Sequence, residues 1–368
     1  MKYNGIYLQN EGNKYFFGFS FWKRGFIKPF FKPLNSGKIY FCKNLEDALK
    51  KGLDKNSKIY IWGRKDFREV EKFAEKNGNR VFYVEDGFIR SVSLGSDLTR
   101  PYSLVVDDLG IYFDATRPSR LEKILNEYEF DEELLRRAEK LKEYLIKKKI
   151  SKYNALKDKD LKINTDKKII LVVGQVEDDA SIIYGGEGMS NLELLKKVYE
   201  KRKNEYIIYK PHPDVVAGNR KGHIPKNEAL KYADEVIEDV SLPSLLDVCD
   251  EVHTITSLSG FEGLIRGKKV YTYGMPFYAG WGLTEDEKKC KRRIKKRSLN
   301  ELIAAAYILY PRYISPKTKE FCEIEVLIEE LEEMKNRYNN DYFYKLLTDV
   351  RNSVFRKVQL IGRMIVGE

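Results

Sequence analysis

A serine-rich stretch stands where one predicted strand ends and a helix begins. The segment TSLSGFEG (256–263) places Ser257, Ser259 and Gly260 at the start of that helix. The first turn of a helix presents unpaired N–H groups and the positive end of the helix dipole, which together bind phosphate. The serine hydroxyls add donors, and Glu262 could accept both hydroxyls of a ribose. These residues predict a nucleotide site; the alternative is an ordinary serine N-cap with Glu262 as its capping-box partner.

A second candidate, KPHPD (210–214), follows another predicted strand. His212 lies between two prolines, which stiffen the loop. Lys210 can neutralise a phosphate, and His212 can donate to the same group as a leaving-group acid. The alternative is a packed loop histidine. Of the other two histidines, His253 falls inside a predicted strand and is expected to be structural, and His223 is a weaker candidate.

Three acids in a row follow a strongly apolar strand. The segment GQVEDDAS (174–181) contains Glu177, Asp178 and Asp179. Carboxylates at such a position can act as a base, as a nucleophile or as metal ligands. A metal site is less attractive because no histidine or further spaced acid accompanies the three. The alternative is a solvated turn.

The first half of the chain offers EDGFIRS (85–91) at the end of a predicted strand. Glu85 or Asp86 could be the base that deprotonates an acceptor hydroxyl. Arg90 could hold a substrate carboxylate through two parallel hydrogen bonds. A simple Asp-Gly turn with a surface arginine is the alternative.

These four segments lie within two successive α/β patterns along the sequence. Strands at 58–63 and 80–85 flank a helix at 66–78, which is expected to have Asp66 as its N-cap and to stop at Gly78, and this βαβ unit implies a parallel sheet. A second pattern starts with the strand at 167–175. Ligands of such sheets bind beyond the carboxyl ends of the strands. The fold class expected is therefore α/β, with two Rossmann-like lobes facing a cleft.

The domain limits follow from a polar, lysine-rich stretch at 150–167. It divides an acceptor-side lobe (1–160) from a donor lobe (161–315), and a helical tail (316–368) is expected to pack back on the first lobe. Further expectations are a strand at 110–114 and a long helix at 341–367. Residues 1–57 are rich in Phe and Tyr and show no clear pattern.

The net positive charge of the chain predicts an anionic partner. Its 368 residues carry a net charge of +11, and eight of the ten residues in KKCKRRIKKR (288–297) are cationic. This segment, and the aromatic and basic stretch 19–32, predict contact with anionic lipid headgroups; solvated loops are the alternative. No recognition helix, zinc-finger or RNP motif supports nucleic acid as a partner. Without a signal sequence or a long apolar run, a cytoplasmic protein is expected.

The order of the four segments resembles that of bacterial sialyltransferases that use CMP-sialic acid. It is more similar still to the retaining β-Kdo transferases of capsule biosynthesis, the KpsC type. The resemblance runs from about residue 58 to 284. The motif QVEDDAS is more similar to the C-terminal module of that family than to its N-terminal module. Proteins of this type usually carry two such modules in tandem, whereas this chain has one. The matching stretches are EDGFIRSVSLGSD (85–97), 101–122, GQVEDDASI (174–182), YKPHPDVVAGNRKG (209–222) and 256–284.

The resemblance implies a GT-B-like enzyme that moves Kdo from CMP-β-Kdo to a lipid-linked Kdo oligosaccharide, with retention and through a covalent aspartyl-Kdo adduct. It implies Asp179 as nucleophile, Glu85 as acceptor base and His212 on the CMP phosphate. It implies no metal and no cofactor. Residues implied to bind the donor are Gln175, Lys210, Ser257, Ser259, Gly260 and Glu262, with Arg90 for a substrate anion.

The implied location is the cytoplasmic side of the inner membrane, with peripheral attachment to an anionic surface and capsule assembly proteins as further partners. Two alternatives remain open at the level of the sequence. One is an inverting enzyme of the CMP-sialic-acid type, with Glu85 or Asp86 as base. The other is a non-enzymatic scaffold in capsule assembly.

Overall fold

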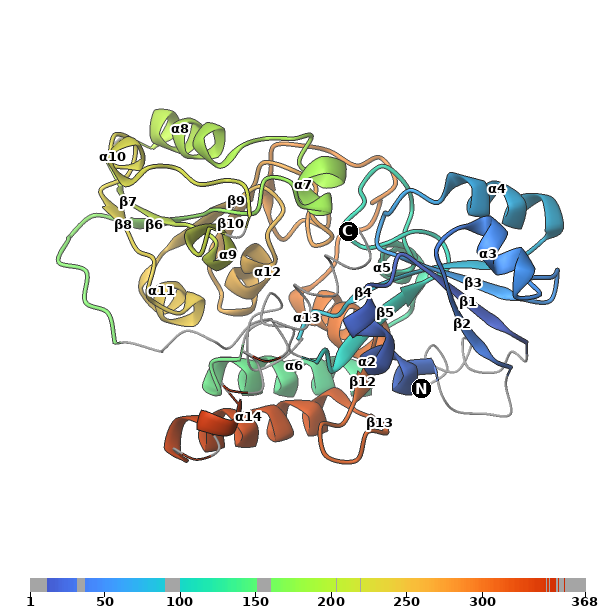
Figure 1. Cartoon of the computed structure of the whole chain (residues 1–368). Helices are drawn as coiled ribbons and strands as arrows, with labels where there is room; N and C mark the ends of the chain where they lie inside the picture. Colours follow the sequence, from blue (N-terminus) through green and yellow to red (C-terminus); the bar gives the residue numbers. More distant parts are fainter. Residues whose placement is uncertain are drawn as a thin grey trace. The chain divides into compact units, whose positions relative to one another are not determined.

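The computed structural model describes residues 12–31, 37–89, 100–150, 160–202, 204–218 and 220–341, together with 343, 345–348, 350 and 354. These residues form two compact α/β units, each with its own sheet (Figure 1). Unit 1 contains the described residues up to Ile111 and those from Ala306 onwards. Unit 2 contains the described residues from Tyr112 to Ala305.

Unit 1 is built on a seven-stranded mixed sheet with the order β13-β12-β5-β4-β3-β1-β2. Strands β1 to β4 run parallel, β5 runs antiparallel to β4, and β12 and β13 continue the sheet in antiparallel pairs. The strands are β1 (Lys14–Phe17), β2 (Ile39–Cys42), β3 (Lys58–Trp62), β4 (Val81–Asp86), β5 (Ser103–Asp107), β12 (Pro311–Ile314) and β13 (Phe321–Cys322).

Aromatic side chains explain why the N-terminal region joins this sheet. Phe16, Tyr60 and Phe82 come from the neighbouring strands β1, β3 and β4, and their rings stack with centroids 4.8 Å and 5.1 Å apart. Such pairs across adjacent strands are a main source of sheet stability. The helices of unit 1 are α2 (Phe21–Phe31), α3 (Leu45–Lys50), α4 (Arg68–Asn77) and α14 (Ile324–Asn340).

Unit 2 is built on a six-stranded parallel sheet with the order β11-β10-β9-β6-β7-β8. Counted along the chain this is the order 3-2-1-4-5-6 read from the other edge, which is the Rossmann order. The direction of winding reverses between β6 and β9, so a ligand site is expected beyond their carboxyl ends. The strands are β6 (Ile169–Val173), β7 (Tyr206–Lys210), β8 (Glu235–Val236), β9 (Glu251–Thr254), β10 (Lys269–Thr272) and β11 (Glu285–Asp286).

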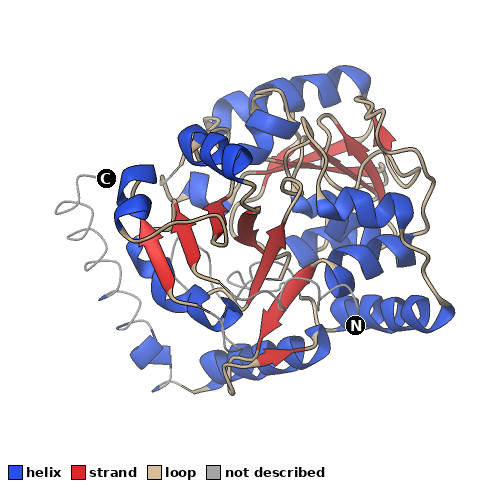
Figure 2. Cartoon of the chain, turned by 90° about the vertical axis from the view of Figure 1, so that its right-hand side faces the viewer, coloured by secondary structure: helices blue, strands red, loops and turns tan. Residues whose placement is uncertain are grey.

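Helices cover both faces of this second sheet. Figure 1 shows α8 and α10 on one face and α11 and α12 on the other, and Figure 2 colours the helices and strands of the whole chain in a second view. Buried aliphatic side chains of β6 and α8, such as Ile170 and Leu194, form the core between them. The helices of unit 2 are α5 (Arg120–Glu127), α6 (Glu132–Lys147), α7 (Ala180–Gly185), α8 (Asn191–Lys201), α9 (Pro213–Val216), α10 (Lys226–Ala229), α11 (Leu242–Val248), α12 (Leu258–Ile265) and α13 (Leu299–Ile303), the last continuing as a π-helix, η2 (Ala304–Leu309).

Some local predictions are wrong. The expected strand at 110–114 is a series of turns, because Asp107 accepts the N–H groups of Leu109 and Gly110 and ends β5 there. Helix α4 begins two residues after Asp66, with Phe67 at its N-cap. The helix expected at 341–367 lies almost wholly outside the described residues.

The compact units also divide the chain at other positions than the predicted limits. Helices α5 and α6 belong to unit 2, although they precede residue 160, and β12 belongs to unit 1, although it precedes residue 316. β13 and α14 also belong to unit 1, the lobe on which the tail is expected to pack. Among the described residues, none of the helices is both long enough and apolar enough to cross a lipid bilayer.

Candidate active site

Gln175 connects the two strands at the switch point of the unit 2 sheet. It lies two residues beyond β6 and is buried. Its side-chain amide accepts the Thr256 N–H at 2.8 Å and donates to Thr256 Oγ1 at 3.1 Å. Its backbone exchanges hydrogen bonds with the Asn191 amide, at 2.8 Å and 2.7 Å. Because its side chain is occupied in this way, Gln175 positions the loop after β9.

Helix α12 begins at the end of that loop, with Ser257 as its N-cap. Ser257 Oγ accepts the Ser259 N–H at 3.1 Å and donates to Ser259 Oγ at 3.0 Å. The third helical residue is Gly260, so Glu262 lies too far along the helix to complete a capping box. The serine N-cap of the alternative is therefore present, whereas Glu262 as its capping-box partner is wrong. Glu262 is buried within the second turn of the helix.

Packing explains the glycine at position 260. A Cβ there would clash with the hydroxyl of Tyr278 and would lie 2.8 Å from Cζ of the same ring. The Tyr278 hydroxyl donates to the Ser257 carbonyl, so the ring crosses the start of α12. The Gly260 N–H donates to the same carbonyl at 3.1 Å. Gly260 therefore allows a close approach of Tyr278.

His212 is the N-cap of the short helix α9, beyond the end of β7. Its Nδ1 accepts the backbone N–H of Asp214 at 3.1 Å. A neutral imidazole that accepts at Nδ1 carries its proton at Nε2. The fold thus fixes the tautomer in which Nε2–H can donate to a phosphate oxygen.

Lys210 ends β7 and is almost completely buried. Its ammonium donates to the Glu238 carbonyl at 3.0 Å. Burial lowers the pKa of Lys210 to about 8, and the nearby Asp239 and Glu238 carboxylates oppose the shift. Lys210 therefore contributes a buried positive charge at neutral pH, with its ammonium directed at the loop after β8.

The three consecutive acids have three different partners. Glu177 accepts the Asn191 N–H at 2.8 Å, and the exposed Asp178 pairs with Arg220 at 3.0 Å. Asp179 is the N-cap of α7, where Oδ1 accepts both the N–H and the hydroxyl of Ser181, at 2.9 Å and 2.8 Å. Within the described residues no donor reaches Oδ2 of Asp179. Its carboxylate is thus held through one oxygen while the other is available for chemistry.

The far end of α7 connects this acid to the loops of the switch point. The Met275 N–H donates to the Gly185 carbonyl at 2.8 Å. A Cβ on Gly185 would lie 3.2 Å from the methyl group of Thr256. Asp179, the loop after β9 and the loop after β10 are therefore parts of one packed assembly beyond the carboxyl ends of β6, β9 and β10.

Two of the predicted residues lie in the first half of the sequence. Glu85 is the penultimate residue of β4, and its Oε1 accepts the N–H of Asp86 at 3.0 Å. It lies at the carboxyl end of a parallel strand, as predicted. Arg90 lies outside the described residues.

His253 is structural, as predicted. It is buried in β9, with Nδ1 3.0 Å from the Tyr273 hydroxyl and Nε2 3.4 Å from Glu251. Burial lowers the pKa of His253, although the Glu251 carboxylate opposes the shift.

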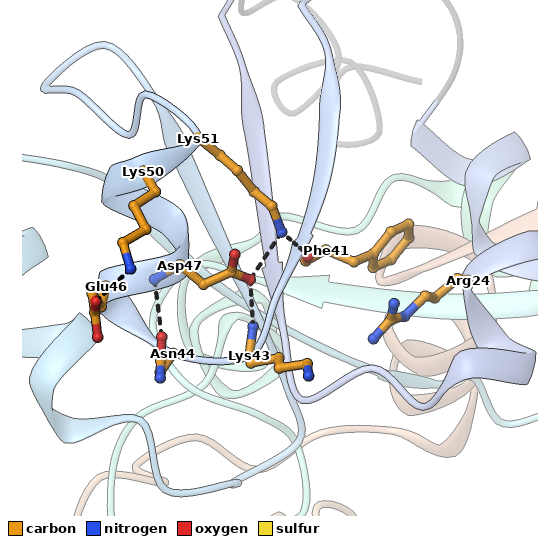
Figure 3. Close-up of a pocket in the computed structure, with 8 residues that line it drawn as sticks. All are labelled: Arg24, Phe41, Lys43, Asn44, Glu46, Asp47, Lys50 and Lys51. Atoms are coloured by element: carbon orange, nitrogen blue, oxygen red, sulfur yellow. Dashed lines mark hydrogen bonds and ion pairs between the residues drawn. The ribbon is translucent and has the colours of Figure 1, made fainter. Parts of the chain in front are cut away.

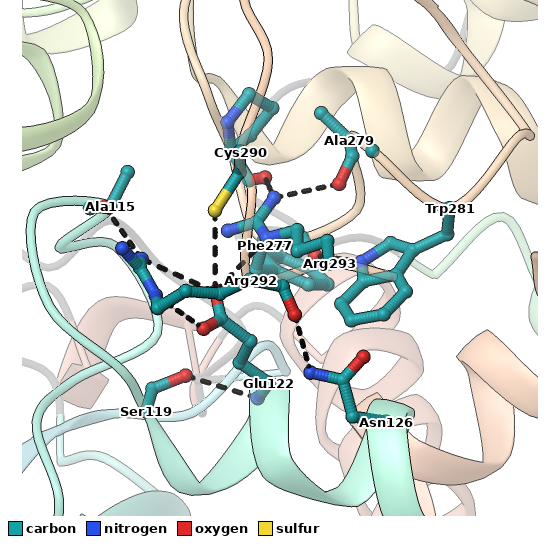
Figure 4. A network of polar contacts seen from close by, with 12 residues as sticks. Ala115, Ser119, Glu122, Asn126, Phe277, Ala279, Trp281, Cys290, Arg292 and Arg293 are labelled. Atoms are coloured by element: carbon teal, nitrogen blue, oxygen red, sulfur yellow. Dashed lines mark hydrogen bonds and ion pairs between the residues drawn. The ribbon is translucent and has the colours of Figure 1, made fainter. Parts of the chain in front are cut away.

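The sequence analysis did not identify a buried charge network in unit 2 (Figure 4). Glu122 on α5 pairs with Arg292 at 2.7 Å and with Arg293 at 3.2 Å. Arg293 also donates to the carbonyls of Pro276 and Ala279. Those carbonyls flank Tyr278, so the network fixes the loop that contacts Ser257. A single acid in a helix and a distant basic segment carry no spacing signal that would have paired them.

This network changes the interpretation of the basic segment 288–297. Arg292 and Arg293 are bound to Glu122, and Arg297 donates to the Leu125 carbonyl at 2.6 Å. The side chain of Ile294 is 77% exposed, and it lies among exposed lysines. The segment is therefore anchored by its arginines and presents an apolar residue with lysines to solvent. The exposed lysines are Lys289, Lys291, Lys295 and Lys296.

Comparison with known proteins supports the sequence resemblance. A family model described as capsule polysaccharide biosynthesis protein matches residues 57–313. The capsule polysaccharide modification protein LipA of Neisseria meningitidis is 46% identical over 332 residues, which are 90% of this chain and 47% of LipA. The chain thus spans about half the length of that curated relative.

Two solved structures from Thermosulfurimonas dismutans are similar over most of the chain. Its KpsC β-Kdo 2,7 transferase is 41% identical with a TM-score of 0.72, covering 88% of this chain and 99% of that one. Its KpsC β-Kdo 2,4 transferase is 36% identical with a TM-score of 0.74, covering 86% and 97%. The predicted α/β, GT-B-like fold class is confirmed by this likeness.

Proposed function

Since the chain belongs to the capsule polysaccharide biosynthesis protein family, we propose that it is a Kdo transferase. Its donor is CMP-β-Kdo and its acceptor is a Kdo-primed lipid. The observation that carries this proposal is the 41% identity over nearly the whole of a solved β-Kdo 2,7 transferase. The strand-end assembly in unit 2 supplies residues suited to such a donor.

The proposed reaction is a double displacement with net retention. Asp179 Oδ2 attacks the anomeric carbon of Kdo, the bond to the CMP phosphate oxygen breaks, and an aspartyl-Kdo ester forms. Glu85 then takes the proton of an acceptor hydroxyl as that oxygen attacks the same carbon. The ester bond breaks and Asp179 regains its carboxylate. The two hydrogen bonds that Ser181 donates to Asp179 Oδ1 suit this role because they fix the plane of the carboxylate.

CMP departs as an anion, which the site is equipped to stabilise. The Nε2–H of His212 would donate to the phosphate. Ser257 and Ser259 would add hydroxyls at the start of α12, where the helix dipole also favours negative charge. Glu262 would accept hydrogen bonds from the ribose hydroxyls. The positive charge of Lys210 would stabilise the CMP anion electrostatically.

The net charge of +11 suits a donor and an acceptor that are both anionic. We further propose peripheral attachment at the cytoplasmic face of the inner membrane. Exposed Ile294 with its neighbouring lysines combines an apolar residue with cations, the composition that interfacial lipid contacts use. Capsule assembly proteins are proposed as further partners.

The proposal is tested with purified protein, CMP-Kdo generated in situ and a synthetic Kdo acceptor. We expect transfer, a β-anomeric product by NMR, and an increment of one Kdo on the intact mass of a Glu85→Gln variant. An α-anomeric product would instead favour the inverting mechanism. The absence both of transfer and of thermal stabilisation by CMP relative to AMP would overturn the enzyme assignment and favour the scaffold.

A further inference from the structure

Unit 1 contains a pocket of about 390 Å³ that the proposed chemistry does not use (Figure 3). It lies beyond the carboxyl end of β2, between that strand, α2 and α3. Its wall includes four cationic side chains, Arg24, Lys43, Lys50 and Lys51, and two carboxylates, Glu46 and Asp47. The pocket therefore has an excess of positive charge.

Both carboxylates are already paired. Lys51 pairs with Asp47 at 2.8 Å, and Lys50 pairs with Glu46 at 2.6 Å. Among the described residues, no carboxylate forms an ion pair with Lys43 or Arg24. In Figure 3 the Lys43 side chain extends towards the Arg24 guanidinium, while Lys50 lies with Glu46 on α3.

The Arg24 guanidinium is held in place. Its Nε donates to the Phe19 carbonyl at 3.4 Å, and its Cζ lies 5.2 Å from the centroid of the Phe41 ring. Contact with an aromatic ring orients a guanidinium and leaves its terminal N–H groups for an oxyanion. Arg24 is thus a preorganised donor for a carboxylate or phosphate, and the exposed Lys43 adds a second positive charge beside it.

The position of the pocket relates it to Glu85. Both lie at the carboxyl ends of parallel strands of one sheet, and β2 is three strands away from β4. Strand spacing places the two ends about 14 Å apart, which is longer than one sugar ring. Between them, Lys23 Nζ lies 3.3 Å from the centroid of Trp62 at the end of β3, which places another positive charge along this edge of the sheet.

We propose that Arg24 and Lys43 bind an acidic group of the acceptor that lies at least one sugar unit away from the reacting hydroxyl. This inference rests on the proposed function, since it assumes that Glu85 marks the reacting end. The group is an oxyanion, either a carboxylate of an acidic sugar or the phosphate of the lipid.

The test compares acceptors of different length. We expect Arg24→Ala and Lys43→Ala each to raise the KM for a Kdo oligosaccharide acceptor about tenfold, the loss of one charge-assisted hydrogen bond. The kcat, the KM for the donor and the KM for a single-Kdo acceptor with a neutral aglycone stay unchanged. Lys50→Ala is the matched control, because Lys50 lines the same pocket but is paired with Glu46.

The possible outcomes distinguish the two sources of the oxyanion. They also distinguish failure of this inference from failure of the proposed function. An effect with lipid-free oligosaccharide identifies the sugar carboxylate, and an effect only with phospholipid-linked acceptor identifies the phosphate. Equal KM values for wild type and both variants with every acceptor would overturn the proposal, as would an effect of equal size on the single-Kdo acceptor. If the wild type transfers nothing, the proposed function fails, and titration calorimetry of Kdo oligosaccharide and of inorganic phosphate against wild type and variants still decides whether the pocket binds an oxyanion.

Discussion

Arg293 donates to Glu122 across 171 residues of sequence, and their side chains are only 3% and 6% exposed. This pair connects α5 to the loop that carries Tyr278, and Tyr278 in turn holds the carbonyl of Ser257. The start of α12 therefore depends on an acid that lies far from the proposed phosphate site in the chain. Residues outside the site thus fix its geometry.

Glu122→Gln is expected to destabilise the protein by about 3–5 kcal/mol. The substitution leaves the buried Arg293 guanidinium without its counter-charge, and an uncompensated buried charge is costly. The free energy of unfolding from urea titration provides the measurement. The matched control is Glu127→Gln in the same helix, because Glu127 pairs with Lys123 in an exposed pair and should change the free energy by less than about 1 kcal/mol. Equal losses in the two variants would mean that the network contributes no more than a surface pair.

Gly260 and Tyr278 should behave as a coupled pair. Gly260→Ala places a methyl group against the Tyr278 ring, and overpacking of this kind costs about 1–3 kcal/mol. Tyr278→Phe removes the hydroxyl that the methyl group would meet first, and it also removes the hydrogen bond to Ser257. In a double-mutant cycle the loss in the double variant should be smaller than the sum of the single losses. Additive losses would show that the methyl group is accommodated elsewhere.

The strand-end positions of the site were predictable because each depends on local sequence. KPHPD, GQVEDDAS, TSLSGFEG and EDGFIRS all follow apolar runs, and a parallel sheet brings the ends of its strands to one edge. The N-cap role of Ser257 follows from residue type at a predicted helix start, whereas the short helix that Asp179 caps was not predicted.

Other features depend on contacts between distant segments, which a single sequence does not encode locally. Strand β12 is paired with β5, about two hundred residues earlier, and its PRYI sequence is as compatible with a loop as with a strand. Arg293 looks like any other member of a basic segment until Glu122 is placed beside it. The role of Gly260 required the ring of Tyr278 to be known. In each case tertiary packing decides what the local pattern leaves open.

The lowered pKa of Lys210 predicts that the free energy of unfolding changes with pH. Its pKa in the folded protein is about 8, below the value near 10.4 of an unfolded lysine. Between these values the unfolded state binds more protons, so stability rises with pH. The cost of the buried ammonium is fully present below pH 8 and is lost as the pH approaches 10.4. Relative to Lys210→Met, the wild type should gain up to roughly 3 kcal/mol over this range.

The measurement is the free energy of unfolding of both proteins in urea at pH 7, 8.5 and 10. Lys226→Met removes an exposed lysine from the same unit and serves as the control for the loss of one lysine charge. A difference between wild type and Lys210→Met that is constant across the three pH values would contradict the lowered pKa.

Asp179 allows the chemical and the structural role of one carboxylate to be separated. Asparagine caps a helix as well as aspartate does, so Asp179→Asn should keep the hydrogen bond from the Ser181 N–H and the stability of the fold. Asp179→Ala removes the cap and should cost about 0.5–2 kcal/mol. Both variants lack the proposed nucleophile, so transfer of Kdo should fall roughly 10³–10⁶-fold in each.

Asp178→Asn completes this comparison, because Asp178 is the adjacent acid but is exposed and paired with Arg220. It should retain most of the wild-type turnover. Intact-mass spectra after incubation with CMP-Kdo should show the Kdo increment on a Glu85→Gln protein and no increment when Asp179→Asn is added. If Asp179→Asn instead keeps most of its turnover, the carboxylate is only a helix cap, and a single displacement with Glu85 or Asp86 as base becomes the better account of the reaction.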